Sequence, residues 1–397
     1  MNTLGVYVQV PLCSSKCAFC NFTSKVAPAD AVQAYLTSLE CEIGLLPRLL
    51  RGDRGRLPRV SGRFLALPVD SIYLGGGTPT LAGPQGLERL FDALRQRFCI
   101  TAAPEITLET TPGSADSRLL AVCRHLGINR LSIGAQSFVD RELRSVGRLH
   151  SGAATIEQFS LARDAGYRNI GLDLIAGLPY QTEASWLCSL RQALNLEPEH
   201  VSVYLFEIDE KSRLGNEVLR HGDRYHAAAV PDEDFMAEAY DQARSLLSNA
   251  GYSQYEISNF ARPGFESRHN RKYWRLEPYL GLGAGAHSFD GYSRWSNETS
   301  TDDYAARLAT GDLPIAEWHA LAESEQMEEF FFLGLRLQEG LDLGGAVSRW
   351  GRAALDGFQP RIASLVRAGL LEEQGERLRL APRAYLVSNE VFQQFLA

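Results

Sequence analysis

The segment VQVPLCSSKCAFCNFTS, residues 8–24, decides the organisation of this chain. It follows a short apolar stretch and carries Cys13, Cys17 and Cys20 in a C-x3-C-x2-C spacing. Three thiolates on one short loop can hold three irons of a [4Fe–4S] cluster and leave the fourth iron open to a ligand. Three incidental cysteines or half of a zinc site are the alternatives, but no fourth zinc ligand follows at a suitable spacing.

The composition is that of an ordinary globular protein without a strong charge bias. The chain has 397 residues, 45% apolar content and a formal net charge of −8, with no long basic run, so we expect no nucleic-acid partner. Its seven cysteines are an odd number without a disulfide pattern, which is typical of a reducing compartment. We recognise no signal peptide and no apolar run of ~18 residues, and therefore expect a cytoplasmic protein.

Patterns typical of strands and of helices alternate along the first half of the chain. The first helix is expected at residues 29–50, and strands are expected at residues 5–10, 70–74, 105–109, 130–134, 169–175 and 201–206. Such repeated steps with short connections predict parallel βα units. The strands look apolar on both sides, as in sheets covered by helices. An open doubly wound sheet and a full or partial barrel are both compatible with this pattern.

Polar or glycine-rich groups follow the predicted strands one after another. They are the cysteine loop, the segment 75–78, Glu109, Gln136, Asp173 and Glu207. Each of them alone is more often a helix cap or a loop residue than a ligand. Because the carboxyl ends of parallel strands open on one face, the series as a whole predicts a single site there.

The second half of the chain follows a different pattern. A helix is expected at residues 232–250 and a strand at residues 252–257. The order helix, helix, hairpin, helix in residues 341–397 is typical of a small winged-helix-like α+β module, and its acidic hairpin argues against DNA binding. The expected units are a barrel with the chemical site at residues 1–210, an extension at residues 211–320 and the C-terminal module at residues 321–397.

The cysteine loop, with Phe19 directly before its last cysteine, resembles the cluster loop of radical S-adenosylmethionine (radical SAM) proteins. In that superfamily the amino and carboxylate groups of SAM chelate the open iron. An electron from the cluster then cleaves SAM to a deoxyadenosyl radical. The resemblance implies a partial (β/α)6 TIM-like barrel of the α/β class, with a [4Fe–4S] cluster on Cys13, Cys17 and Cys20.

The glycine-rich segment GGGTP, residues 75–79, allows close approach of the backbone to a ligand. A phosphate loop is the alternative, although the Lys-Ser/Thr of a P-loop and the G-x-G-x-x-G pattern are both missing. The segment resembles the superfamily motif that binds the amino group of SAM, which implies roles for Gly76, Gly77 and Thr78.

Further SAM contacts are implied by the same resemblance. The matching positions are Tyr7, Phe19, Glu109, Gln136, Arg148 and Asp173. The alternative for Arg148 is a solvated loop charge. Asp173 lies within an apolar run, where an unpaired carboxylate is costly, so we expect a partner or a ligand there.

Longer segments resemble the oxygen-independent coproporphyrinogen III oxidase family. They are YVQVPLCSSKCAFCNF, YLGGGTPT, SIGAQSF, DLIAGLPYQT, YEISNFARPG, SRHNRKYW and YLGLGAGAHSF. Two positions depart from the dehydrogenase branch: Phe22 stands where that branch has an extra cysteine, and Gln9 where it has a histidine. Both departures argue against decarboxylation of coproporphyrinogen and favour the heme-chaperone branch of the family.

The HNRKYW segment, residues 269–274, resembles a motif of the heme-chaperone branch. A histidine nitrogen is a good axial ligand for heme iron, so the resemblance implies that His269 binds heme and that Tyr273 and Trp274 stack on it. The alternative is that the aromatic rings pack the barrel mouth while His269 bonds to a loop. His287 is a second candidate heme ligand.

Three functions are compatible with the sequence. The first is a heme-binding radical SAM-type protein that passes heme to a heme-requiring client, for which a membrane enzyme is one candidate. A homodimer is one candidate assembly of this protein. The second is an enzyme that converts two porphyrin propionates to vinyl groups by oxidative decarboxylation. The third is a regulatory binding protein in which the cluster and SAM are structural.

Overall fold

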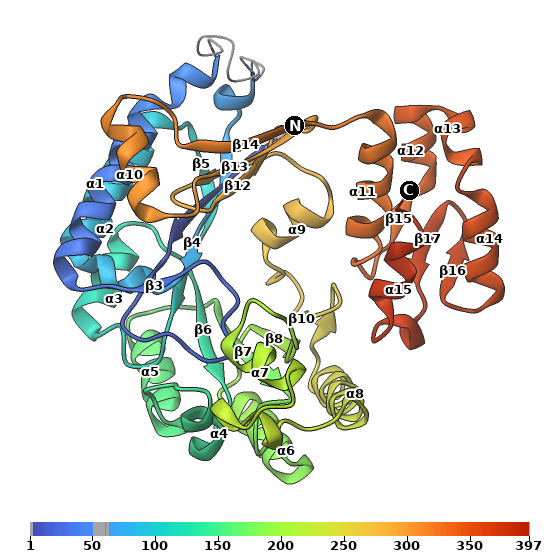
Figure 1. Cartoon of the computed structure of the whole chain (residues 1–397), viewed down its shortest axis with the longest axis horizontal. Helices are drawn as coiled ribbons and strands as arrows, with labels where there is room; N and C mark the ends of the chain where they lie inside the picture. The colour runs from blue at the N-terminus through green and yellow to red at the C-terminus, as the bar shows by residue number, and fades with distance from the viewer. Residues whose placement is uncertain (1–2, 51–59, 61–62, 397) are drawn as a thin grey trace.

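The computed structural model describes residues 3–50, 60 and 63–396. Its larger part is a curved sheet with helices along the outside, and a small C-terminal module lies beside it (Figure 1). Six neighbouring strands run parallel: β1 (Leu4–Val10), β4 (Val69–Gly76), β5 (Ile100–Thr110), β6 (Arg130–Gln136), β7 (Ile170–Ala176) and β8 (His200–Leu205). The outer helices include α1 (Ala29–Leu45), α2 (Gly83–Arg97), α3 (Ser117–His125), α5 (Gly152–Asp164), α6 (Glu183–Asn195) and α8 (Glu233–Asn249). The predicted partial barrel of βα units is thereby confirmed.

Side chains on the six strands alternate between two different environments. On β1, Val6 and Val8 are buried in the apolar core, whereas Tyr7 and Gln9 point into the barrel. The inward positions of the other strands carry Ser71, Tyr73, Glu105, Thr107, Glu109, Arg130, Ser132, Asp173, His200 and Ser202. The prediction of strands that are apolar on both sides is therefore wrong. The barrel interior is polar, which requires partners or a ligand for the groups that it buries.

Both edges of the parallel sheet are extended by short strands. β11 (Tyr279–Leu282) runs parallel to β1, and β12 (His287–Phe289), β13 (Ser293–Asn297) and β14 (Ile315–Ala320) follow antiparallel. At the other edge, β10 (Asn259–Ala261) pairs with β8 and with β9 (Ser253–Gln254). The strand predicted at residues 252–257 is broken, because the buried Glu256 carboxylate accepts from Ser258 N and Asn259 Nδ2 and turns the chain back.

The first helix is shorter than predicted. It ends at Leu45 and continues only as a 3₁₀ turn, Leu46–Leu50. Pro47 has no N–H to donate to the preceding turn, which ends the α-helix just before it. Within the described residues no helix is both long and apolar enough to span a membrane.

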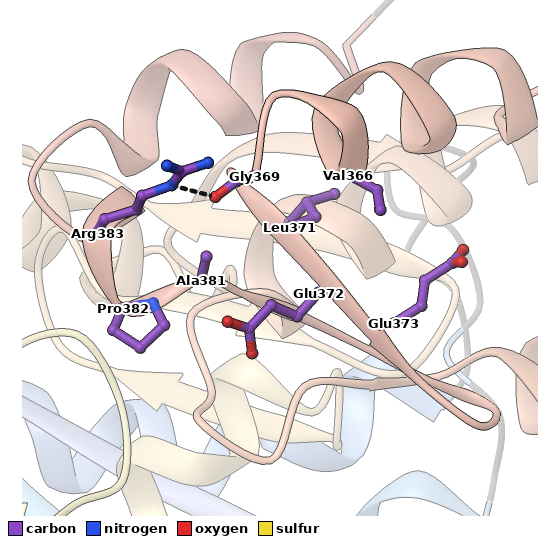
Figure 2. Close-up of a pocket in the computed structure, with 8 residues that line it drawn as sticks. All are labelled: Val366, Gly369, Leu371, Glu372, Glu373, Ala381, Pro382 and Arg383. Carbon is purple, nitrogen blue, oxygen red and sulfur yellow. Dashed lines mark hydrogen bonds between the residues drawn. The ribbon is translucent and has the colours of Figure 1, made fainter.

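The C-terminal module contains the predicted hairpin and last helix, but in residues 341–397 three helices, and not the predicted two, come before the hairpin. Its elements are α11 (Glu323–Gly334), β15 (Leu341–Asp342), α12 (Leu343–Trp350), α13 (Arg352–Asp356), α14 (Gln359–Arg367), β16 (Leu371–Gln374), β17 (Arg377–Leu380) and α15 (Ser388–Gln393). Phe331 stacks on Phe395 with centroids 4.5 Å apart, which joins α11 to the end of the chain. Figure 2 shows a pocket of about 560 Å³ on this module, where Arg383 donates to the Gly369 carbonyl at 2.6 Å. This pocket is separate from the strand ends of the barrel.

A buried carboxylate joins α1 to the β11–β14 edge. Glu42, only 2% exposed, accepts from Gly283 N at 2.8 Å, from Asn297 Nδ2 at 2.6 Å and from the Tyr304 hydroxyl at 2.6 Å. Burial raises the pKa of Glu42 from 4.5 to about 7, against the lowering effect of these three hydrogen bonds.

We predict that Glu42 makes the stability of the protein pH-dependent. The folded chain holds a proton on Glu42 between pH 4.5 and about 7, where the unfolded chain releases it. Stability therefore falls as pH rises through this window, by up to about 3 kcal/mol, and stays level above it. In urea unfolding at pH 5 and pH 8, Glu42→Gln should lose that part of the pH dependence.

The matched control is Glu88→Gln on the exposed face of α2, which removes one carboxylate without touching the buried network. It should unfold with the same pH dependence as the parent protein. An unchanged pH dependence in Glu42→Gln would contradict the role assigned to this carboxyl.

Candidate functional site

The cysteine loop is attached to the barrel by backbone hydrogen bonds. Gly77 N donates to the Val10 carbonyl and Thr78 N to the Leu12 carbonyl, each at 2.8 Å. A Cβ on Gly77 would lie 2.5 Å from the Leu12 carbonyl oxygen, so only glycine fits at this contact. The GGGTP segment therefore uses two of its N–H groups to hold the start of the loop, and a ligand ammonium there would bind to carbonyl oxygens.

The loop is also held on its other side. Ala18 N donates to the Val146 carbonyl, and Leu214 N donates to the Ala18 carbonyl, both at 2.9 Å. Ala18 is buried in a small apolar cluster with Val146, Ile175, Leu178, Phe206 and Leu214, and Phe19 packs against this cluster. Phe19 thus anchors the loop beside the strand ends of β7 and β8.

The three cysteines of the loop are free thiols that lie near one another. Cys17 is 8% exposed, and Cys13 and Cys20 are partly exposed. Burial raises the pKa of the Cys13 thiol, and the neighbouring Cys20 and Cys17 act in the same direction. In the described part of the chain, no three His, Cys, Asp or Glu side chains are placed to hold one metal ion. Three cysteine thiolates on one short loop are a donor set that fits a [4Fe–4S] cluster.

Arg148 lies directly beside the cysteine loop. Its Nη1 donates to Cys17 Sγ at 3.6 Å and its Nη2 to the Gly134 carbonyl at 2.5 Å. Its Nε is buried and has no hydrogen-bond partner among the described residues, and the same holds for the Thr110 hydroxyl. Arg148 is thus not a solvated loop charge, and unpaired buried groups of this kind fit a polar ligand such as SAM.

Gln136 adopts a strained backbone conformation at the end of β6. Its φ is +62°, which is uncommon for a residue other than glycine. The pairing of β6 with β7 shifts register between Ile133 and Gln136, which marks a bulge at this point. Such local strain is typical of ligand-binding sites, where it aims a side chain.

Two half-buried carboxylates point into the barrel below the loop. Glu109 accepts from the Tyr73 hydroxyl at 2.9 Å and from Gly76 N at 3.0 Å. Burial, and then the nearby charge of Asp173, raise its pKa to about 7 against the effect of these bonds. Asp173 accepts from the Ser132 hydroxyl at 3.0 Å, and burial raises its pKa as well. Half-buried carboxyl groups with raised pKa values are suited to an ammonium or hydroxyl ligand.

Tyr7 and Gly76 complete the group of predicted residues that the barrel brings together. The Tyr7 ring lies 5.9 Å from that of Tyr73, and its hydroxyl donates to Gln9 Oε1 at 2.5 Å. Tyr73, Ser132 and the buried Arg130 also line the barrel interior, although they were not predicted from the sequence. Their signal was an alternation of polar and apolar residues along each strand, which marks one polar face.

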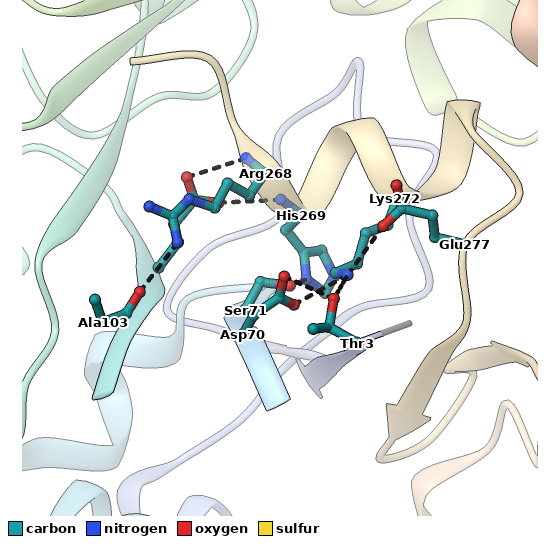
Figure 3. A network of polar contacts seen from close by, with 9 residues as sticks. Thr3, Asp70, Ser71, Ala103, Arg268, His269, Lys272 and Glu277 are labelled. Carbon is teal, nitrogen blue, oxygen red and sulfur yellow. Dashed lines mark hydrogen bonds and ion pairs between the residues drawn. The ribbon is translucent and has the colours of Figure 1, made fainter. Parts of the chain in front are cut away.

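The HNRKYW segment forms α9 (Arg268–Trp274) and lies at the opposite end of the barrel from the cysteine loop (Figures 1 and 3). His269 Nδ1 bonds to the Ser71 hydroxyl at 3.0 Å, near the start of β4, and its ring would contact a Cβ placed on Gly5. The cysteine loop follows the other ends of these strands. The buried Lys272 amine pairs with Asp70 at 3.0 Å and Glu277 at 3.1 Å, which closes this end of the barrel.

The predicted heme ligands are occupied by contacts within the protein. His269 is 1% exposed, and its Nε2 bonds to the Tyr273 hydroxyl at 2.9 Å. Burial and the nearby Lys272 lower its pKa to about 3, so the ring is neutral. Tyr273 packs on Tyr279 with centroids 4.6 Å apart, and Trp274 lies under the Arg336 guanidinium. Iron coordination by His269 would require the loss of one of its two ring hydrogen bonds.

We predict that Gly77→Ala disrupts the cysteine loop without unfolding the barrel. The added methyl group clashes with the Leu12 carbonyl and displaces the loop from β4. After anaerobic reconstitution, this variant should lose most of its bound iron and sulfide while its far-UV circular dichroism is unchanged. Gly44→Ala on α1, where a Cβ meets nothing within 4 Å, is the control and should reconstitute fully. Equal iron content in the two variants would contradict the prediction.

Comparison with known proteins shows the family of this chain. Residues 7–192 match the Radical SAM superfamily, and residues 321–387 match the HemN C-terminal domain. The chain is 34% identical to Heme chaperone HemW of Bacillus subtilis over 395 residues, which cover 99% of each chain. It is 30% identical to Heme chaperone HemW of Escherichia coli over 399 residues, covering 99% of this chain and 98% of the other.

A solved structure has the same fold over nearly the whole chain. Coproporphyrinogen III oxidase (HemN) from Escherichia coli, a radical SAM enzyme, aligns with a TM-score of 0.83 at 24% sequence identity. The alignment covers 99% of this chain and 90% of that one. Because the full-length matches above 30% identity are to proteins named HemW, the chain belongs to the radical SAM superfamily and, within it, to the HemW family.

Proposed function

We propose that this protein is a radical SAM-type heme chaperone that acts in the cytoplasm. It carries a [4Fe–4S] cluster on Cys13, Cys17 and Cys20, binds SAM at the open iron, and delivers heme to a heme-requiring client protein. The observation that carries this proposal is the full-length similarity to proteins named heme chaperone, combined with an intact cysteine loop. The free state of all seven cysteines supports a reducing compartment.

Different residues around the cysteine loop bind different chemical groups of SAM. When bound, the cluster would supply the electron that cleaves SAM. Arg148 carries a positive charge toward the loop and a free Nε–H, which suit the SAM carboxylate. Glu109 and Asp173 are acceptors for the hydroxyls or the ammonium, and Gln136 and Tyr7 line the same interior. Gly76, Gly77 and Thr78 offer carbonyls to the ammonium at the edge of the loop.

Two positions weigh against the dehydrogenase function. Gln9 occupies the inward position beside Gly76, where its Oε1 would lie 2.5 Å from a Cβ on that glycine. Phe22 stands on the cysteine loop with 65% of its surface exposed. An amide and a phenyl ring can neither shuttle a proton nor bind iron as a histidine and a cysteine can.

Exposed apolar side chains around the loop support contact with another protein. Phe22, Val26 and Leu149 are 65%, 58% and 79% exposed, and all three belong to the loop or to the segment beside it. For this exposed apolar surface we propose two partners, a client protein or a second copy of the chain. A membrane-associated client is compatible with the surface.

The function is tested by heme titration and enzyme assay on one sample. Anaerobically reconstituted protein is titrated with heme while the Soret band is followed. The same sample is then incubated with coproporphyrinogen III, SAM and a reductant. Stoichiometric heme uptake without a vinyl product supports the chaperone. A decarboxylated product without stable heme binding would replace it with the dehydrogenase.

We predict that Cys17→Ala separates cluster binding from heme binding. The variant loses one of three cluster thiolates, so the brown iron–sulfur absorption and any SAM cleavage should disappear, because an incomplete ligand set does not retain the cluster. Heme uptake should persist in part, since heme needs no contact with this sulfur. Cys188→Ala, at an exposed cysteine of α6, should keep both properties. Complete loss of heme uptake in Cys17→Ala alone would show that the cluster carries the heme.

A further inference from the structure

One edge of the main sheet is open to a further strand. The two edge strands of this sheet are β14 and β9. β9 has only two residues, whereas β14 has six, and four of these six residues are exposed. Edge strands are commonly protected by proline, lysine or a bulge. β14 contains neither proline nor lysine, and its pairing with β13 shifts register only beside its start, between Ser296 and Asn297. Residues 317–320 therefore form a regular, unprotected edge.

One hydrogen bond shows which backbone groups of β14 point to this edge. Leu321 N donates to the Tyr292 carbonyl at 2.9 Å, and these two residues stand opposite each other when the register of β13 and β14 is extended by one position. Hydrogen-bonded and non-hydrogen-bonded positions alternate along an antiparallel pair. The odd-numbered residues of the strand therefore bond to β13, and Trp318 and Ala320 direct their N–H and C=O groups outward. In the described part of the chain, no other element bonds to the backbone of these two residues.

The side chains of β14 differ between its two faces. Trp318 lies on one face, where it stacks on Trp295 with ring centroids 4.7 Å apart. Glu317 and His319 lie on the other face, and both are exposed. His319 Nε2 bonds to Glu325 at 2.8 Å, and its other ring nitrogen makes no hydrogen bond with the residues that the structure describes. The Glu317 carboxylate has no ion-pair partner among those residues. An acidic side chain and an imidazole with a free nitrogen thus stand two positions apart on the open edge.

This edge is complementary to a second copy of itself. When two copies of one strand pair in antiparallel orientation, a twofold axis passes through one position, and the residues on its two sides pair with each other. An axis at Trp318 places Glu317 of each copy opposite His319 of the other. An axis at Glu317 would oppose two carboxylates, and an axis at His319 would oppose two imidazoles. Because unlike charges directly across a strand pair are stabilising and like charges are destabilising, the register centred on Trp318 is favoured.

The same register pairs the open backbone groups. Trp318 faces Trp318 of the second copy, and Ala320 faces Ala316, at positions where two residues exchange both of their backbone hydrogen bonds. The two Trp318 rings continue the stack with Trp295 across the axis. The acidic and imidazole side chains fall at non-hydrogen-bonded positions, where opposing Cα atoms are only about 4.5 Å apart. An imidazolium between two carboxylates can donate to both of them, so His319 can keep its bond to Glu325.

We infer that this protein associates with a second copy of itself through the β14 edge, in the antiparallel register centred on Trp318, so that one sheet continues across both copies. The inference goes beyond the heme-chaperone function and does not depend on bound heme. It assigns the second copy to the β14 edge and leaves the exposed apolar surface of Phe22, Val26 and Leu149 to the client.

Two charge variants of the full-length protein test this register. Glu317→Lys opposes a cation to His319 of the second copy, and His319→Glu opposes two carboxylates. Each variant alone should dimerise about tenfold or more weakly than the wild type in analytical ultracentrifugation. An equimolar mixture of the two variants should recover the dimer, because one edge of the mixed pair then carries two basic side chains and the other two carboxylates. Glu88→Lys, with the same charge change on the exposed face of α2, is the control and should dimerise like the wild type.

A backbone variant tests the strand pairing itself. Ala320→Pro removes an outward N–H and should weaken the dimer, whereas Ala320→Ser keeps this N–H and should not. Far-UV circular dichroism confirms that each variant is folded. A wild type that stays monomeric both before and after cluster reconstitution would overturn the inference. A mixture of the charge variants that stays monomeric, or a dimer that Glu317→Lys and Ala320→Pro leave unchanged, would overturn it as well. Heme titration of the same samples tests the proposed function separately, so the two failures are distinguishable.

Discussion

Two backbone hydrogen bonds from Gly77 and Thr78 to the carbonyls of Val10 and Leu12 determine where the cysteine loop lies against the sheet. They join the end of β4 to the cysteine loop that leaves β1, and the contact is so close that a side chain at Gly77 has no room. The loop is therefore placed by the sheet itself rather than by its own sequence. Glu109 and Asp173 lie near this end because their strands open on the same face, and Arg148 reaches the loop from the segment after α4.

The polar interior of the barrel is the second constraint on the structure. Arg130 is buried, and Glu109 and Asp173 are half-buried, on one face of strands whose other face builds the apolar core. Burial raises the pKa of both carboxyl groups, because the charged form of a carboxyl group is less favourable away from water. A ligand with ammonium and hydroxyl groups relieves this cost. The polar interior is therefore suited to the charged ligand that we propose.

The two ends of the barrel have different tasks. At the strand-start end, α9 fills the opening with His269 and Lys272, whose polar groups are paired with Ser71, Asp70 and Glu277. At the other end lie the cysteine loop and the residues predicted to bind SAM. The motif that resembles a heme site in sequence also closes the barrel, because its side chains make contacts that hold the strand starts together.

The sequence by itself determined the cysteine loop, the βα order and the succession of polar groups at the strand ends, since each of these depends on local spacing or on the rule that parallel strands end on one face. The sequence also determined the two positions that depart from the dehydrogenase branch, Gln9 and Phe22. Only the tertiary structure decided that the strand interior is polar, that α9 lies far from the loop and that His287 lies near it. The place of β11 and β12 depends on the pairing of β1 with β11, two strands separated by more than 250 positions of sequence, and no local pattern encodes that register.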